Sequence, residues 1–164
     1  MMVDQAPTAQ PASTDTRKMT FDEFLHLPDD LYAELVDGDV IEFVPPSIKH
    51  NDIAAFLFYL LLTYVGYRPV GRVFHAPIAL KLPGEIHGRE PDLLFVAEVH
   101  SEQIKNNYIE SPVDAVFEIV SPESIERDRN DKFNEYQATQ IPEYWLISSS
   151  TARALISSKH SGEI

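Results

Sequence analysis

The stretch Ala115-Val-Phe-Glu-Ile-Val120, followed by Ser121-Pro122, decides the fold. Five of its six residues are apolar, which is typical of a strand buried on both faces, and the Ser-Pro pair ends it. An ionised carboxylate at Glu118 needs a cation or hydrogen-bond donors, because an unpaired buried charge is strongly unfavourable. The pattern therefore predicts a central strand that presents one acidic group to a partner.

A second apolar run, Asp92 to Val99, also reads as a strand and begins with a carboxylate after Pro91. Side chains alternate along strands, so each carboxylate shares a face with apolar residues of its own strand. If the two strands are adjacent, they present Asp92 and Glu118 to one site. A Pro-Asp pair is also common at the start of a turn, so Asp92 alone indicates little.

The remaining patterns surround these two strands with helices and further strands. We expect an α/β fold of the α+β type, in which a mixed sheet is flanked by helices. The predicted elements are a short capped helix from Thr20 to Pro28, a β-hairpin over 32–44 around Asp37-Gly38, an apolar helix from His50 to Val65, a strand from Arg72 to Leu82, a turn or loop from Pro83 to Gly88, a helix from Glu126 to Thr139, a strand from Glu143 to Ile147 and a short strand at Ala154 to Ile156. The apolar helix suits the core or a subunit interface.

Composition limits the protein class. The chain has 164 residues, no cysteine and a net charge of −13. This length favours one domain over 19–164, and residues 1–18 have the composition of a disordered leader. No signal peptide or membrane-length apolar run occurs, which predicts a cytoplasmic protein with no membrane partner. The acidic balance means that any binding to DNA must be local.

Most site chemistries are absent from the sequence. The histidines lack metal-ligand spacing, and neither a glycine-rich phosphate loop nor a Gly-x-Ser-x-Gly nucleophile elbow occurs. A carboxylate site remains, and oxygen ligands of this kind suit a hard divalent cation such as Mg²⁺.

Each candidate residue also has a purely structural interpretation. Glu118 fits a buried ion pair with Arg89, Arg127 or Arg129 about as well as it fits a site. Lys132 lies four residues after Asp128 on the predicted helix, a spacing that favours a surface salt bridge. Glu34 alternates with Leu35 in the hairpin and fits a solvated strand position.

Taken together, several motifs in this order resemble the Uma-type restriction endonuclease family of the PD-(D/E)XK nuclease superfamily. The resemblance covers about 19–147, and it depends on the combination of motifs because none is specific alone. The matching residues are Glu34, Arg89 to Asp92, Phe117 to Pro122, Asp128 to Lys132, Tyr136 and Ile141 to Leu146.

The resemblance implies a restriction-endonuclease-like core and a metal-dependent hydrolysis of DNA. It assigns Asp92, Glu118 and the Ile119 carbonyl to Mg²⁺ or Mn²⁺. Val120 occupies the usual lysine position of the superfamily motif, and the resemblance gives the lysine role to Lys132 on the following helix. Glu34 becomes a third acidic group, which either binds the metal through water or orders Lys132.

Two uses of such a fold remain open at this point. In the first, the protein is a nuclease whose DNA substrate meets a small basic cleft. In the second, it is a catalytically degenerate binding or assembly module, such as a homodimer formed through the apolar helix at Ile53 to Leu62. The candidate cleft residues are Lys49, Arg68, Arg72, Arg89, Arg127 and Arg129.

Overall fold

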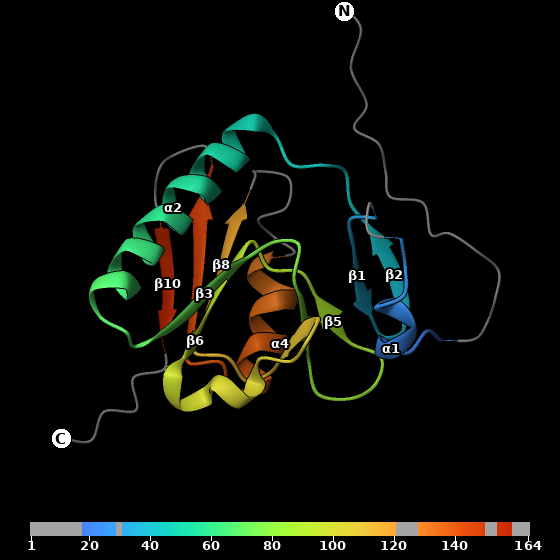
Figure 1. Cartoon of the computed structure of the whole chain (residues 1–164). Helices are drawn as coiled ribbons and strands as arrows, with labels where there is room; N and C mark the ends of the chain where they lie inside the picture. The colour runs from blue at the N-terminus through green and yellow to red at the C-terminus, as the bar shows by residue number, and fades with distance from the viewer. Residues whose placement is uncertain (1–17, 29–30, 121–127, 150–153, 159–164) are drawn as a thin grey trace, which may run out of the picture.

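Two mixed five-stranded sheets and a few helices make up the fold (Figure 1). The computed structural model describes residues 18–28, 31–120, 128–149 and 154–158. Sheet A has the strand order β2-β1-β5-β4-β7, and sheet B has the order β10-β9-β8-β6-β3. The prediction of a mixed α/β architecture is confirmed. The strands are divided between two sheets, however, where a single sheet was expected.

Sheet A contains β1 (Ala33–Val36), β2 (Asp39–Glu42), β4 (Ala79–Lys81), β5 (Gly88–Arg89) and β7 (Tyr108–Glu110), and sheet B contains β3 (Gly71–His75), β6 (Leu93–Ala97), β8 (Ala115–Val120), β9 (Glu143–Ser148) and β10 (Ala154–Ser158). The helices are α1 (Phe21–Phe24), α2 (Ile48–Tyr67), the 3₁₀ helix η1 (Glu98–Gln103), the π-helix η2 (Asp128–Lys132) and α4 (Phe133–Ala138).

Strand β8 is the centre of sheet B, as its sequence predicts. All six of its residues are buried, and it lies between β6, to which it is antiparallel, and β9, to which it is parallel. Val116 and Val120 enter the main core together with Tyr136 of α4, on the face that Glu118 shares by strand alternation. Phe117 and Ile119 face the other way and pack near α2. The adjacency of the two predicted carboxylate strands is therefore confirmed.

The stretch Arg72 to Leu82 is not one strand. It is divided into β3, an edge strand of sheet B, and β4, which lies inside sheet A. The cis Ala76-Pro77 peptide bond lies between them. Proline has no N–H to donate to a strand ladder, so pairing is interrupted there. Of the two parts of this stretch, only β3 pairs with β6, whereas β4 pairs with β5 and β7. The last residue of the expected loop, Gly88, starts the short strand β5.

The N-terminal predictions agree with the structure. Thr20 and Glu23 form the predicted capping box of α1, and β1 and β2 pair across the Asp37-Gly38 turn. Both turn residues have positive φ, 51° and 77°, as expected for the tight turn of a two-residue hairpin. The hairpin positions Glu34 at the edge of the second core cluster, which contains Phe21 and Leu35.

Helix α2 covers one face of sheet B but is not buried (Figure 1). Its inner side packs on β3 and β8 through side chains that include Leu57 and Leu61. None of its residues is fully buried, because its other sides face solvent within the part of the chain that the structure describes. The expectation of a core helix is therefore wrong, and the subunit-interface alternative remains.

The predicted helix from Glu126 to Thr139 is observed as η2 followed by α4, and its first two residues lie outside the described residues. Tyr136 is buried and packs edge-on against Tyr144, and Phe133 lies beside the same ring. The predicted leader lies almost wholly outside the described residues, so its boundary stays a prediction. No helix in the described ranges is long and apolar enough to cross a membrane.

Candidate active site

Glu118 is buried at the centre of a hydrogen-bonded group of side chains. Its Oε1 accepts a hydrogen bond from the Lys132 ammonium at 2.9 Å and one from the Tyr136 hydroxyl at 3.1 Å. Both donors come from the η2–α4 helix, which continues from the η2 turn into α4 beside β8. Lys132 thus supplies a cation for Glu118. The expected pair with Arg89 is not observed, because Arg89 pairs with Glu34 and Glu135, and the expected pairs with Arg127 and Arg129 lie outside the described side chains.

Lys132 also connects the two sheets. Its Nζ lies 2.8 Å from Oε1 of Glu34 on β1, and its side chain is 4% exposed. The i,i+4 surface salt bridge with Asp128 is therefore the wrong interpretation, because a buried ammonium paired with two carboxylates is not a surface group. Glu34 is likewise not a solvated strand position, since only 2% of it is exposed.

A buried arginine completes this group on the side of sheet A. Arg89 of β5 donates from Nη1 to Glu34 at 2.8 Å, and its Nε and Nη2 form a fork on the carboxylate of Glu135 in α4. Such two-pronged arginine pairs fix geometry as well as charge. We call the linked side chains Glu118, Lys132, Glu34, Arg89 and Glu135 the charged junction.

The charged junction favours the ionised forms of Glu34 and Arg89. Burial by itself raises the pKa of Glu34, but the nearby charges of Lys132 and Arg89 outweigh it, and the pKa lies below the ordinary value. Burial lowers the pKa of Arg89, whereas Glu34 and Glu135 raise it by more. The hydroxyl of Tyr136 stays protonated, because burial and the charge of Glu118 raise its pKa. It can therefore donate to Glu118.

Asp92 is the residue directly before β6, and its side chain is more exposed than that of Glu118. The register Leu93↔Phe117 places it opposite Glu118, and its Oδ2 accepts a 2.6 Å hydrogen bond from the Ile119 N–H. His50, in the first turn of α2, places Nε2 3.2 Å from both carboxylate oxygens. The Asp92 side chain is 18% exposed, so water and ligands can reach it.

Two groups close to Asp92 in the site or in the sequence have raised pKa values. The hydrogen bond to Asp92 raises the pKa of His50 against the opposing effect of burial, and the charges of Asp92 and Glu118 add to it. The pKa of Glu90 is raised to about 7, first by burial and then by the charge of Glu34. Carboxylate charges thus contribute to both shifts, although burial is the larger cause for Glu90.

The structure brings Glu34, Glu118 and Lys132 into direct contact and connects Asp92 to the same strand through Ile119. The Ile119 N–H, rather than its carbonyl, is the group observed to contact Asp92. No three or more His, Asp or Glu side chains among the described residues are arranged to bind a metal ion. A metal at this place would therefore have two carboxylate side chains at most from the predicted set.

Four of the six residues predicted to form a basic cleft have described side chains, and these four are not gathered in one place. Arg89 is used inside the charged junction, and Arg72 stacks over the Phe74 ring at 4.9 Å. Lys49 lies on α2, facing the groove described below, and Arg68 ends that helix. Arg127 and the side chain of Arg129 lie outside the described residues.

Two contact residues were missed as members of the site. Glu135 was not singled out, although it follows Lys132 by three residues and therefore lies on the same side of the helix. His50 was noted only as the residue that opens the apolar helix. No local pattern reveals its contact with Asp92, because the two residues are 42 positions apart.

The chain is similar to one family of known proteins and to solved structures. Residues 21–163 match the model of the Uma2 family, described as "Putative restriction endonuclease". The fold is similar to the crystal structure of a "putative nuclease belonging to DUF820" from Anabaena variabilis ATCC 29413, with a TM-score of 0.70 and 20% identity over 88% of this chain and 82% of that chain. No curated protein matches the chain. Because the family model spans most of the chain, the protein belongs to the Uma2 family.

Proposed function

We propose that the protein is a metal-dependent endonuclease that hydrolyses phosphodiester bonds of DNA on a PD-(D/E)XK nuclease core. The observation that carries the proposal is the buried ammonium of Lys132, 2.9 Å from Glu118, which lies opposite Asp92 in the strand register. Two carboxylates on neighbouring strands with a lysine beside them form a set suited to phosphoryl chemistry. In this chain a helix supplies the lysine, because Val120 occupies the strand position.

The chemistry of the donors fits a hard divalent cation. Asp92 and Glu118 would hold Mg²⁺ or Mn²⁺, with the Ile119 carbonyl as a third oxygen ligand. Magnesium usually binds proteins through one or two carboxylates and keeps several waters, so a set without a third side chain is adequate. The Asp92 carboxylate, which raises the pKa of His50 through a hydrogen bond and its charge, also favours a doubly charged cation.

The residues of the site divide the work of hydrolysis. A divalent cation, when bound, supplies a water of lowered pKa and polarises the phosphate. Lys132 provides a fixed positive charge beside the carboxylates, where negative charge develops during attack on phosphorus. Glu34 and Glu118 hold this ammonium in place, and Tyr136 fixes the orientation of Glu118. His50 positions Asp92 through the contact at 3.2 Å.

A second candidate function is a catalytically degenerate module used for binding or assembly. It is favoured by one observation, namely that the charged junction connects β1, β5, β8 and the η2–α4 helix. A set of buried ion pairs in this position has a structural use even without a metal. Metal binding separates the two candidates, because a purely structural junction does not need a cation.

Cleavage of supercoiled plasmid and of single-stranded DNA, each with Mg²⁺ and with Mn²⁺, tests the proposal. The wild-type chain should cleave at least one substrate, and EDTA should stop the reaction. Glu118→Gln, which keeps the side-chain shape, should remove both cleavage and Mn²⁺ binding measured by calorimetry. Glu85→Gln is the matched control, because the Glu85 side chain is 70% exposed and has no role in the proposed site.

The outcomes distinguish the two candidates. Cleavage that persists at equal rate in Glu118→Gln comes from a contaminating nuclease and contradicts the assignment of the site. Absence of both cleavage and Mn²⁺ binding in a folded wild-type chain supports the degenerate module. Circular dichroism of each variant shows whether it is folded.

A further inference from the structure

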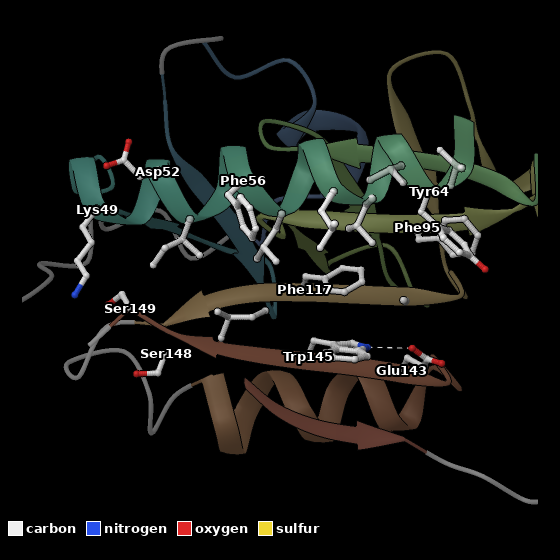
Figure 2. Close-up of a pocket in the computed structure, with 18 residues that line it drawn as sticks. Lys49, Asp52, Phe56, Tyr64, Phe95, Phe117, Glu143, Trp145, Ser148 and Ser149 are labelled. Carbon is white, nitrogen blue, oxygen red and sulfur yellow. Dashed lines mark hydrogen bonds between the residues drawn. The ribbon is translucent and has the colours of Figure 1, made fainter. Parts of the chain in front are cut away.

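A large apolar groove lies between α2 and sheet B, away from the candidate active site (Figure 2). Its volume is about 1040 Å³. Phe117 of β8 and Trp145 of β9 form its floor, and Phe56, Leu60 and Tyr64 of α2 form its wall. None of the four predicted site residues lines it, so the groove has no part in the proposed nuclease chemistry.

The flank of α2 above the groove exposes large apolar side chains at helical spacing. Positions 56, 59 or 60, 64 and 67 recur every three or four residues, so their side chains follow one side of the helix. The exposed fractions are 64% for Phe56, 70% for Tyr59, 53% for Leu60, 56% for Tyr64 and 85% for Tyr67. A contiguous apolar surface of this kind is rare on a monomer and typical of an interface.

The exposed area is close to what a stable dimer needs. An aromatic side chain buries about 200 Å², so the four aromatic residues of this flank expose roughly 550 Å², and Leu60 and the groove floor increase the total. A standard interface buries about 800 Å² on each partner. We propose that α2 and the groove beside it form the interface of a two-fold dimer of this chain.

Residues 1–17 and 159–164 contain few large apolar side chains. A second α2 supplies them in the required number and spacing. In a two-fold dimer the same surface is used on both copies, so each α2 inserts its apolar flank beside the groove of the other copy.

Charges at the two ends of the groove suit an antiparallel arrangement of the two α2 helices. Lys49 and Asp52 lie at one end of the groove, and Glu143 lies at the other (Figure 2). When two copies meet antiparallel, Lys49 of one copy can pair with Glu143 of the other, while Asp52 adds one negative charge at the same end. Leu60, close to the middle of α2, then lies near its own counterpart.

Sedimentation velocity of the whole chain over a micromolar concentration series tests the proposal. We expect the wild type to reach twice the chain mass of 18.6 kDa as concentration rises. Leu60→Lys should raise the dimer dissociation constant at least tenfold, because it places like charges near each other at the two-fold axis. Val99→Lys is the matched control, since Val99 is 78% exposed on η1, and it should leave the dissociation constant unchanged.

Charge reversal tests the antiparallel arrangement separately. Lys49→Glu and Glu143→Lys should each weaken the dimer, because each brings like charges together at both ends. The double variant should restore most of the affinity of the wild type. A merely structural effect of either substitution would persist in the double variant.

Several results would overturn the proposal. One is a wild-type chain that stays monomeric throughout the series. Another is a dimer that Leu60→Lys leaves intact, which would place the interface on a different face. A monomer that binds an apolar dye in the groove would assign the groove to a small ligand. These outcomes are independent of DNA cleavage, so the dimer and the nuclease proposals can fail separately.

Discussion

The charged junction buries charged side chains, whereas the flank of α2 beside the groove exposes apolar ones, so each region reverses the usual distribution of residues. In the junction, Glu34, Arg89, Glu118 and Lys132 are at most 5% exposed, although such residues are almost never buried. On the outer flank of α2, the side chains of Phe56, Tyr59, Tyr64 and Tyr67 are more than half exposed. Ordinary core packing surrounds both regions.

The two regions differ in what offsets the unfavourable burial of charge in one and the exposure of apolar side chains in the other. Every buried charge of the junction has a counter-charge in the same chain, so these charges are paired within the folded monomer. The groove has no such internal compensation in the described residues. Buried charge therefore indicates local chemistry, whereas exposed apolar surface indicates a partner.

The largest expected effect is on the junction. Lys132→Ala should lower the rate of DNA cleavage by about 100-fold or more, the magnitude found when one electrostatic stabiliser is removed. Mn²⁺ binding should persist in the folded fraction, because the cation neutralises the carboxylates that Lys132 leaves unpaired. Single-turnover kinetics and calorimetry measure the two quantities.

Lys105→Ala is the control for this prediction, since Lys105 pairs with Glu110 at 3.1 Å on the far part of sheet A. An unchanged rate in Lys132→Ala would show that the helix lysine has no role in catalysis. The junction would then be a structural ion-pair group only.

Glu34→Gln should destabilise the fold at neutral pH by about 3 kcal/mol, the magnitude for breaking a buried ion pair. The pKa of Glu34 in the folded chain lies below 4.5, the ordinary value. Its ionised form therefore stabilises the fold above pH 4.5, and this contribution is lost as pH falls through the folded pKa. The stability difference between wild type and variant should shrink accordingly in urea unfolding at acidic pH.

The exposed Glu85 provides the comparison for this measurement. Glu85→Gln should change stability by less than about 0.5 kcal/mol at either pH, as surface substitutions usually do. A difference for Glu34→Gln that grows on acidification would contradict the sign of its pKa shift.

A smaller effect is expected for His50, which links α2 to the site. His50→Gln should weaken Mn²⁺ binding by about tenfold, because groups that orient a metal-binding carboxylate typically contribute that much or more. Calorimetry at fixed pH measures the affinity. His26→Gln is the control, since the His26 ring contacts only the Asp22 carbonyl in the described structure. Equal Mn²⁺ affinity in the two variants would show that His50 does not contribute to metal binding.

The smallest effect is expected on the outer flank of α2. Tyr67→Ser should alter the free energy of unfolding by less than about 0.5 kcal/mol at concentrations where the chain is monomeric. The Tyr67 side chain is 85% exposed, so little packing is lost. A large destabilisation of the monomer would show that this flank supports the fold itself, and the contrast between groove and junction would disappear.

Much of the site follows from the sequence because strands impose a fixed alternation. Glu118 amid apolar residues indicated a buried carboxylate, and the Asp92 run indicated a neighbouring strand. Both strands are observed, with Asp92 opposite Glu118. The choice of Lys132 came from the order of motifs, not from spacing, which favoured a surface salt bridge with Asp128.

Other features depend on contacts between distant segments. The division of the strands between two sheets reflects the interruption at Ala76-Pro77, which the apolar pattern of Arg72 to Leu82 concealed. The exposure of α2 depends on which elements cover it, and hydrophobicity alone does not specify that.

The sequence by itself determined that Glu118 is buried and needs a positive partner, because an apolar strand fixes its surroundings. Only the tertiary structure decided which cation provides the partner. Arg89, one of the arginines predicted as a partner, belongs to β5 of sheet A and pairs with Glu34 and Glu135, whereas the η2 turn brings Lys132 between Glu34 and Glu118. Local patterns fix burial, but the pairing of charges depends on where two sheets and a helix meet in space.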